Sequence, residues 1–292
     1  MSFEFWPEFW IVQTLNALQF SMLLFLLSIG LTVIFGLMHF VNLAHGVLYA
    51  LGAYAGWSVA SWMGSYWLAL IAAPLAVALA GIVVYLGLVR RMRRAGHMNQ
   101  VLVTFGLIFV FTDLFSIIWG DHALGVAVPV LLEGRVDVFG ITYPLYRLFV
   151  IGVGLGVMVL LWLGLSRTAL GQMIRAGVDN ETMAACLGID VERLFFLVFV
   201  IGCALAGLAG IVAAPVLSLE PYMGTPILIP VLIVVVIGGL GSLRGAIVGA
   251  LVVGFIQTFG IVLAPQLASV VIYALLAAVL IFRPAGLFPA RA

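Results

Sequence analysis

The chain carries no Asp, Glu, Lys or Arg between Phe9 and Val89, a run of 81 residues. A bilayer core about 30 Å thick needs about 20 apolar residues for each helix that crosses it, so this run predicts three spans with short turns. The further charge-free segments are 95–112, 148–166, 194–219, 221–243 and 245–282. The last is long enough for two helices folded back at Ala264-Pro265. Together these segments predict a single transmembrane domain, 1–292, with an all-α integral membrane fold, a polytopic helical bundle of eight or nine spans.

Composition agrees with a protein whose main solvent is the lipid bilayer. Hydrophobic residues make up 65% of the chain and charged residues 8%, whereas soluble domains run near 45–50% and about 25%. The chain has 12 Arg, no Lys and 11 acidic residues, for a formal charge of +1. It therefore offers no basic stripe that would neutralise a run of phosphates, and nucleic acid is excluded as a partner.

The segment 226–240 is predicted to form a helix that is too short to span the bilayer. Pro226 and Pro230 interrupt it, and the run Gly238-Gly239-Leu240-Gly241 ends it after some 15 residues. We expect a re-entrant half-helix here.

The positions of the arginines predict the orientation, because short cytoplasmic loops carry an excess of positive charge. The densest cluster is Arg90, Arg91, Arg93 and Arg94, and counting spans outward from it leaves only Arg135 and Arg147 outside. An odd number of crossings follows, with the N-terminus outside and the C-terminus in the cytoplasm of a bacterial inner membrane. The acidic, aromatic start of the chain does not resemble a signal peptide. Its aromatic residues are typical of an interfacial belt; they are Phe3, Phe5, Trp6, Phe9 and Trp10.

Two segments outside the spans are long enough to dock other proteins. The segment 120–147 is the extracytoplasmic loop, and Val136 to Tyr143 in it has the β-branched and aromatic pattern of a short hairpin. The segment 167–193 is cytoplasmic. Cys186 lies in it and Cys203 in a span, where disulfides are not expected.

The cytoplasmic segment 167–193 is a partly amphipathic polar helix that stops at Gly188-Ile189 before a new apolar span. Arg175 and Asp179 lie four residues apart and could pair on one face. The apolar residues of the segment need somewhere to pack; they are Met173, Ile174, Met183, Ala184 and Leu187. A groove on a cytoplasmic partner fits this requirement, and a helix lying on lipid head groups is the alternative.

Several kinds of chemistry lack their sequence motif. Without Lys there is no GxxxxGK loop, so an ATPase site on this chain is not expected and ATP and Mg would be bound by partner subunits. HExxH, GxSxG and paired CxxC are missing too, and no metal site is predicted.

The block RAGVDNETMAACLGIDVERLF, residues 175–195, resembles the coupling segment of ABC importer permeases in its branched-chain amino acid form. The general permease pattern places Glu-Ala-Ala before a Gly, and here Thr182-Met183-Ala184 precede Leu187-Gly188. The resemblance implies that a short cytoplasmic helix sits in a cleft of the ATPase. The coupling residues it implies are Arg175, Asp179, Asn180, Met183, Ala184, Leu187, Gly188 and Ile189.

Two more blocks resemble the same family, in its H-type subunit. GLMHFVNLAHGVLYALGAYAGW, residues 36–57, is similar to an Asn-Phe-Ala-His-Gly block, with Val47 where many relatives carry Glu. VVVIGGLGSLRGAIVGALVVG, residues 234–254, is similar to a late Gly-rich block. An interrupted helix leaves backbone groups free, and these are tolerated only where they line a cavity or protein. The translocation pathway residues expected on this ground are Asn42, His45, Gly46, Gly239 and Gly241.

The residues alone leave another interpretation of the first block open, in which Asn42 caps a helix and a neighbouring carbonyl satisfies His45.

The resemblance implies four kinds of partner: a second homologous permease subunit, two cytoplasmic ABC ATPases, an extracytoplasmic solute-binding protein and the lipid bilayer. Relatives of this subunit resemble permeases for urea, amides and aromatic acids as well. A stand-alone secondary transporter or channel is the alternative of a different class, and it predicts more membrane-embedded acids than Asp113. An intramembrane enzyme would need a nucleophile and a base, and no such pair is apparent.

Overall fold

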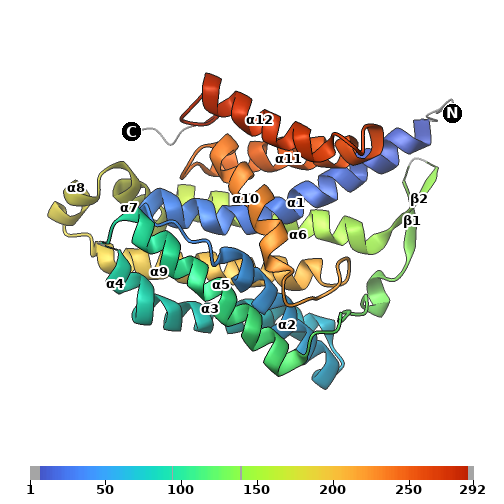
Figure 1. Ribbon diagram of the computed structural model, residues 1–292, viewed down its shortest axis with the longest axis horizontal. Helices are drawn as coiled ribbons and strands as arrows, with labels where there is room; N and C mark the ends of the chain where they lie inside the picture. The colour runs from blue at the N-terminus through green and yellow to red at the C-terminus, as the bar shows by residue number, and fades with distance from the viewer. Residues whose placement is uncertain (1–6, 94, 139, 289–292) are drawn as a thin grey trace.

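The computed structural model describes residues 7–93, 95–138 and 140–288, and helices make up most of this chain (Figure 1). The long helices are α1 (Pro7–Met38), α2 (His45–Met63), α3 (Tyr66–Val84), α5 (His97–Trp119), α6 (Leu145–Arg167), α9 (Val191–Ala213), α10 (Gly224–Gly238), α11 (Leu243–Leu263) and α12 (Ala268–Phe282). The shorter elements are the π-helix η1 (Tyr85–Val89), α4 (Arg90–Met92), the 3-10 helix η2 (Val130–Leu132), β1 (Arg135–Val138), β2 (Ile141–Pro144), α7 (Ala169–Asp179) and α8 (Glu181–Cys186). The all-α membrane fold is confirmed, apart from the one hairpin.

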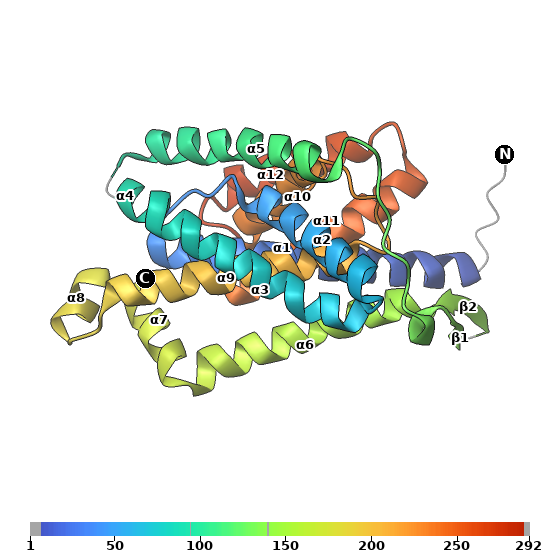
Figure 2. The same ribbon diagram turned by 90° about the horizontal axis from the view of Figure 1, so that it is seen from below.

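Helix α1 runs through the middle of the bundle, and its neighbours are α6, α9, α10 and α11 (Figures 1 and 2). With 32 residues it is about 48 Å long. Both its apolar and its polar side chains are buried, among them Ser21, Ser28 and Thr32. The hydroxyls of Ser21 and Thr32 donate to carbonyl oxygens one turn back, so they need no partner on another helix.

Six helices of the described chain are long and apolar enough to cross a membrane: Glu8–Met38, Tyr66–Met92, His97–Trp119, Leu145–Arg167, Val191–Ala213 and Leu243–Leu263. The predicted count of eight or nine spans is therefore not confirmed. Helix α10 has 15 residues and reaches about 22 Å, less than the bilayer core. Helix α12 is equally short.

The predicted helix boundaries agree with the structure in the regions that depend on Pro and Gly. The charge-free run from Phe9 holds α1, α2 and α3. The segment 245–282 folds back between Leu263 and Ala268. The short helix expected at 226–240 is confirmed as α10, with Pro230 inside it and a positive φ of 104° at Gly239 just after it. Re-entry into the membrane stays a prediction.

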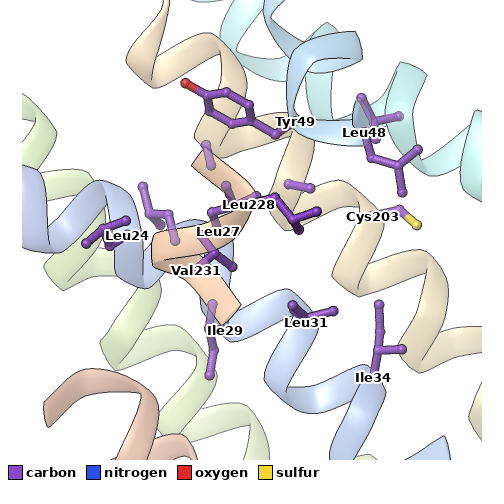
Figure 3. Close-up of a cluster of buried hydrophobic side chains, with 14 of the residues drawn as sticks. Leu24, Leu27, Ile29, Leu31, Ile34, Leu48, Tyr49, Cys203, Leu228 and Val231 are labelled. Atoms are coloured by element: carbon purple, nitrogen blue, oxygen red, sulfur yellow. The ribbon is translucent and has the colours of Figure 1, made fainter. Parts of the chain in front are cut away.

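The buried core lies where α1, α2, α9 and α10 meet (Figure 3). Leu27 of α1 lies beside Leu228 and Val231 of α10 in this view. Cys203 of α9 is buried and free, and Cys186 is exposed and free. Both cysteines are thus unpaired, as expected.

Glycines let these helices approach closely. A Cβ on Gly202 of α9 would lie 2.6 Å from Ile34 of α1. Gly210 meets the backbone of α2, and Gly249 of α11 meets Val234 of α10. Small residues on α9 and α11 therefore allow the backbones of neighbouring helices to approach closely.

Different segments of the chain lie at the two ends of the bundle. The predicted hairpin is confirmed: β1 and β2 are antiparallel, with Val136 opposite Tyr143. The Tyr143 hydroxyl donates to Asn16 Oδ1 at 2.9 Å, so the hairpin lies at the end where α1 begins. At the other end the last described residues return to α10, where the Leu287 and Phe288 N–H groups donate to the carbonyls of Ile237 and Gly238. Phe3, Phe5, Trp6, Arg94 and Arg291, which entered the predictions, lie outside the described residues.

Candidate functional site

The segment 167–193 folds as two short helices, of which α8 projects beyond the long helices at one end of the molecule (Figure 2). Side chains cap each start. Thr168 Oγ1 accepts from the Gly171 N–H at 3.1 Å, and Asn180 Oδ1 accepts from the Met183 N–H at 2.9 Å. Asp190 Oδ1 accepts from the Arg193 N–H and so starts α9. These caps explain why a segment with so few apolar contacts is helical.

Gly188 ends α8 in the left-handed conformation, with a φ of 85°. The N–H of Ile189 donates to the carbonyl of Ala184, and that of Gly188 to the carbonyl of Ala185. This pair of hydrogen bonds is the Schellman motif. The stop predicted at Gly188-Ile189 is confirmed.

The apolar side chains of the segment divide into two groups. Ile174 and Ala184 are buried against the bundle. Met173, Met183 and Leu187 are 41%, 58% and 75% exposed. We call these three the outward face. An outward apolar face at one end of a membrane protein is unusual unless another surface covers it.

Arginines at the end of the α3–α4 helix hold the segment in place. Arg93 Nη2 lies 3.2 Å from Glu181 Oε1, and its guanidinium stacks 4.3 Å from the centre of the Phe195 ring. Arg90 Nε lies 2.8 Å from Glu192 Oε1. Exposed pairs of this kind contribute about 0–1 kcal/mol each, so they orient the segment more than they stabilise it.

The predicted pairing of Arg175 with Asp179 is wrong. Three ion pairs form among the described residues, and neither residue belongs to any of them. Both instead line a cavity of about 690 Å³, together with Gly241, Arg244 and the end of α6. Four-residue spacing permits an ion pair, but here both side chains line the cavity without forming one.

The connection between α1 and α2 returns into the bundle. Helix α1 ends at Met38, His39 has a positive φ of 49°, and α2 begins only at His45. His45 Nε2 lies 3.0 Å from the carbonyl oxygen of Leu27, eleven residues before the end of α1. Eleven residues of helix measure about 16 Å, roughly half of a bilayer core. Helix α2 therefore starts about midway along the bundle.

The polar side chains at this start are buried and only partly satisfied. Asn42 is 3% exposed and His45 is fully buried. Among the described residues neither Asn42 Nδ2 nor His45 Nδ1 has a hydrogen-bond partner. A neighbouring carbonyl does satisfy one His45 nitrogen. Asn42 does not cap α2, because the residue before that helix is Ala44 and no side chain bonds its first turn.

Helix α10 begins against the start of α2. A Cβ on Gly46 would overlap the Gly224 carbonyl, and a Cβ on Gly224 would lie 2.7 Å from the Gly46 carbonyl carbon. The first turn of α10 is partly exposed at Thr225 and Pro226. Two helix starts therefore meet in the interior, next to Asn42 and His45. Interrupted helices of this kind are where transporters place their binding sites.

The late Gly-rich block lies at the α7 end instead. Gly239 is buried, and its Cβ position would lie 2.7 Å from the Phe288 carbonyl oxygen. Gly241 packs on Gly36 of α1 and lines the 690 Å³ cavity. The five expected pathway residues thus form two groups, one in the middle of the bundle and one at its end. Within the described residues no group of His, Cys, Asp or Glu is arranged to hold a metal ion.

Residues 13–280 match the family model described as the permease component of the branched-chain amino acid transport system. The chain belongs to this family. All three blocks that carry the resemblance lie inside the matched range. The described fold is thus that of a multi-pass membrane permease of this family.

Individual relatives match along most of their length. The high-affinity branched-chain amino acid permease protein BraD of Pseudomonas aeruginosa is 29% identical, with 94% of each chain covered. LivH of Escherichia coli is 27% identical, covering 96% of this chain and 95% of its own. The ribose import permease RbsC of Escherichia coli is 28% identical over 86% of this chain and 78% of its own. No solved structure matches the chain.

Sequence reasoning missed one residue that supports the permease's α1–α2 connection. Gln100 of α5 is 3% exposed. Its Oε1 accepts from the Val41 N–H at 3.4 Å, and its Nε2 donates to the carbonyl of Ala95 at 3.2 Å. Thr104, one turn on, also donates toward Val41. Polar residues spaced by four along a helix with apolar outer faces were the available signal.

Proposed function

We propose that this chain is the membrane-spanning permease subunit of an ABC importer that moves branched-chain amino acids or similar small polar solutes across the inner membrane. Separate ATPase subunits supply the energy. The observation that carries the proposal is the outward face of α7 and α8, formed by Met173, Met183 and Leu187. An apolar, well-capped helix pair with an uncovered face fits a groove on another protein.

The partners follow from the chain's chemistry and its relatives. With no Lys, the chain has no P-loop lysine, so ATP and Mg bind to partner ATPases. A second homologous permease subunit completes the pathway, and a solute-binding protein delivers the solute to the extracytoplasmic loop 120–147. Relatives named as components of branched-chain amino acid systems support this assembly.

The orientation places α7 and α8 in the cytoplasm and the start of α1 outside. Three observations support it. The Arg90 and Arg93 side chains contact the segment 167–193, so the two predicted cytoplasmic regions share one end. The Tyr143–Asn16 bond joins the predicted outer loop to the start of α1. Phe288 lines the same cavity as Arg175, which brings the last described residues to the cytoplasmic end.

The solute passes close to the paired starts of α2 and α10. Support comes from the buried, unpartnered Asn42 Nδ2 and His45 Nδ1 atoms beside two helix N-termini, where partial positive charge favours an anionic group. Movement of α7 on ATP binding would reach α1 through Gly177, whose Cβ position lies 2.8 Å from Leu37. Leu37 is two residues from the left-handed His39 that begins the α1–α2 connection.

Placing a negative charge on the outward face tests the proposal. In the assembled importer, Met183→Glu and Leu187→Glu should reduce solute-stimulated ATP hydrolysis by about tenfold or more, since contact residues of this kind contribute about 2 kcal/mol or more. Met63→Glu is the matched control, because Met63 is 67% exposed at the end of α2, outside both the coupling segment and the loop 120–147. Unchanged stimulation in both outward-face variants would contradict the proposal.

The solute class has one alternative within the same fold, permeases for urea, amides or aromatic acids. The similarity to a ribose import permease supports the idea that related permeases move different solutes. The melting temperature of the partner binding protein distinguishes them, because a bound solute raises it. A shift with leucine and none with urea supports amino acid transport; the reverse supports the alternative.

A further inference from the structure

Two arginines line the 690 Å³ cavity at the α7 end without a partner. Arg175 of α7 and Arg244 of α11 both contribute to its wall. Neither takes part in an ion pair within the described chain. The hydroxyl-bearing residues Ser166 and Ser242 lie in the same wall, and Asp179 is its one acidic residue. The lining therefore carries a net positive charge and faces an open space.

The cavity continues into an apolar crevice between α6 and α9. Val33, Leu165 and Ile174 line both spaces. The crevice holds about 120 Å³, and its walls are almost entirely apolar. They include Leu160 and Leu161 on α6 and Val198, Ile201 and Leu205 on α9. A charged space and an apolar slot thus form one amphipathic site.

Helix α6 presents its exposed side to lipid beside this site. Leu155, Leu160 and Leu163 are 42%, 68% and 40% exposed on it. Trp162, which lines the cavity, is 53% exposed near the end of the helix. Tryptophan is enriched at the level of the lipid head groups. Trp162 thus favours a position at the membrane surface for the charged part of the site and a position within the hydrocarbon for the crevice.

We infer that this site binds a phospholipid with an anionic head group, whose phosphate contacts Arg175 and Arg244 and whose acyl chain enters the crevice between α6 and α9. Guanidinium groups bind phosphate oxygens through charge-assisted hydrogen bonds. Basic pockets between helices at the membrane surface are suited to such head groups. The inference rests on the proposed function in one respect: the orientation proposed above means that the lipid comes from the cytoplasmic leaflet.

A bound lipid would join three elements of the transport machinery. The cavity wall holds α7, the Gly241–Ser242 turn with the start of α11, and Leu287 and Phe288 after α12. The lipid would thus fill the space between the coupling segment and the short helix α10. The last carbonyls of α10 accept hydrogen bonds from the Leu287 and Phe288 N–H groups.

Two variants separate head-group binding from chain binding. Arg244→Gln removes a guanidinium outside the residues assigned to coupling. Gly164→Phe fills the crevice, and it is tolerated sterically because a Cβ on Gly164 meets nothing within 4 Å. The matched controls are Arg91→Gln, an exposed arginine outside the cavity, and Gly156→Phe, which is equally open and lies on the same helix.

The measurement is native mass spectrometry of the purified importer complex with added phosphatidylglycerol or phosphatidylcholine. Wild type and both controls should retain phosphatidylglycerol in preference to phosphatidylcholine. Arg244→Gln should reduce phosphatidylglycerol retention about tenfold, as expected for a lost bond to a charged group. Gly164→Phe should reduce retention of both lipids. Solute-stimulated ATP hydrolysis, measured in parallel, reports on the proposed function separately.

Three results would overturn the inference. Equal retention in Arg244→Gln, Gly164→Phe and their controls would show that lipid binds elsewhere. Full competition by glycerol 3-phosphate at the lipid's own concentration would show a site for free phosphate. Retention of no lipid in the assembled complex, with Arg244 and Gly164 in place, would show that a partner protein fills the cavity.

Discussion

His45 Nε2, on the first residue of α2, lies 3.0 Å from the backbone carbonyl oxygen of Leu27 in the interior of α1. The contact fixes how far the 39–44 segment returns into the bundle before α2 starts. It also brings Gly46 against Gly224, the first residue of α10. Both helix starts therefore lie next to one buried histidine.

Replacing His45 tests this role. His45→Ala removes the bond to Leu27 and leaves a space in the core, at a cost of about 1–3 kcal/mol, so the melting temperature of the purified complex should fall by several degrees. His45→Gln keeps a side-chain donor and should recover part of the loss. His97→Ala changes an exposed histidine and serves as the control; an equal fall in all three variants would contradict the assignment.

Gly46 should tolerate no side chain. In Gly46→Ala the added methyl overlaps the Gly224 backbone, and overpacking of this kind costs about 1–3 kcal/mol. Gly87→Ala adds the same methyl in open space and should be neutral. The amount of folded permease in detergent, measured by fluorescence-detected size exclusion, compares them. If Gly46→Ala folds as well as Gly87→Ala, the two helix starts are not in close contact.

Replacing Gln100 should disturb the 39–44 segment more than replacing its exposed neighbour Asn99. Gln100→Leu removes the acceptor for the Val41 N–H and the donor to Ala95. It leaves two partly buried backbone groups unsatisfied, at about 1 kcal/mol each. Asn99→Leu makes a similar change on the exposed side of α5. Faster hydrogen exchange of the 39–44 amides in Gln100→Leu alone is the expected result, and unchanged exchange would remove Gln100 from this role.

The αL glycine of the coupling segment can be tested without disturbing packing. Gly188→Val places a β-branched residue at a φ of 85°, where strain costs about 1–3 kcal/mol, yet no atom lies within 4 Å to clash with it. Solute-stimulated ATP hydrolysis should fall severalfold while the importer complex still assembles. Gly156→Val is the control on α6. Normal stimulation in Gly188→Val would mean that the exact end of α8 has no role in coupling.

Features that depend on neighbouring residues could be predicted from the sequence. Charge-free runs gave the long helices, and the Gly188-Ile189 stop and the 136–143 hairpin follow from local turn chemistry. The length of α10 follows from its prolines and glycines. The count of spans could not be settled in the same way, because α10 and α12 are shorter than a bilayer core.

Contacts between distant residues were beyond sequence reasoning. Arg93 and Glu181 are 88 residues apart, and nothing local marks them as partners. The predicted Arg175–Asp179 pair was wrong for the opposite reason, since the helical spacing permits a contact that these two side chains do not make. His45 was identified as a candidate, but its contact with Leu27 depends on how the 39–44 segment folds back, which hydrophobic periodicity does not report.

Uptake into proteoliposomes tests the central claim most directly. The measurement compares solute entry with the purified chain alone, with the chain and its second permease subunit, and with the full complex of ATPases and binding protein. The proposed function predicts entry only with the full complex and only when ATP is supplied. Solute entry driven by the purified chain alone, without ATP, would contradict it and favour a stand-alone transporter or channel.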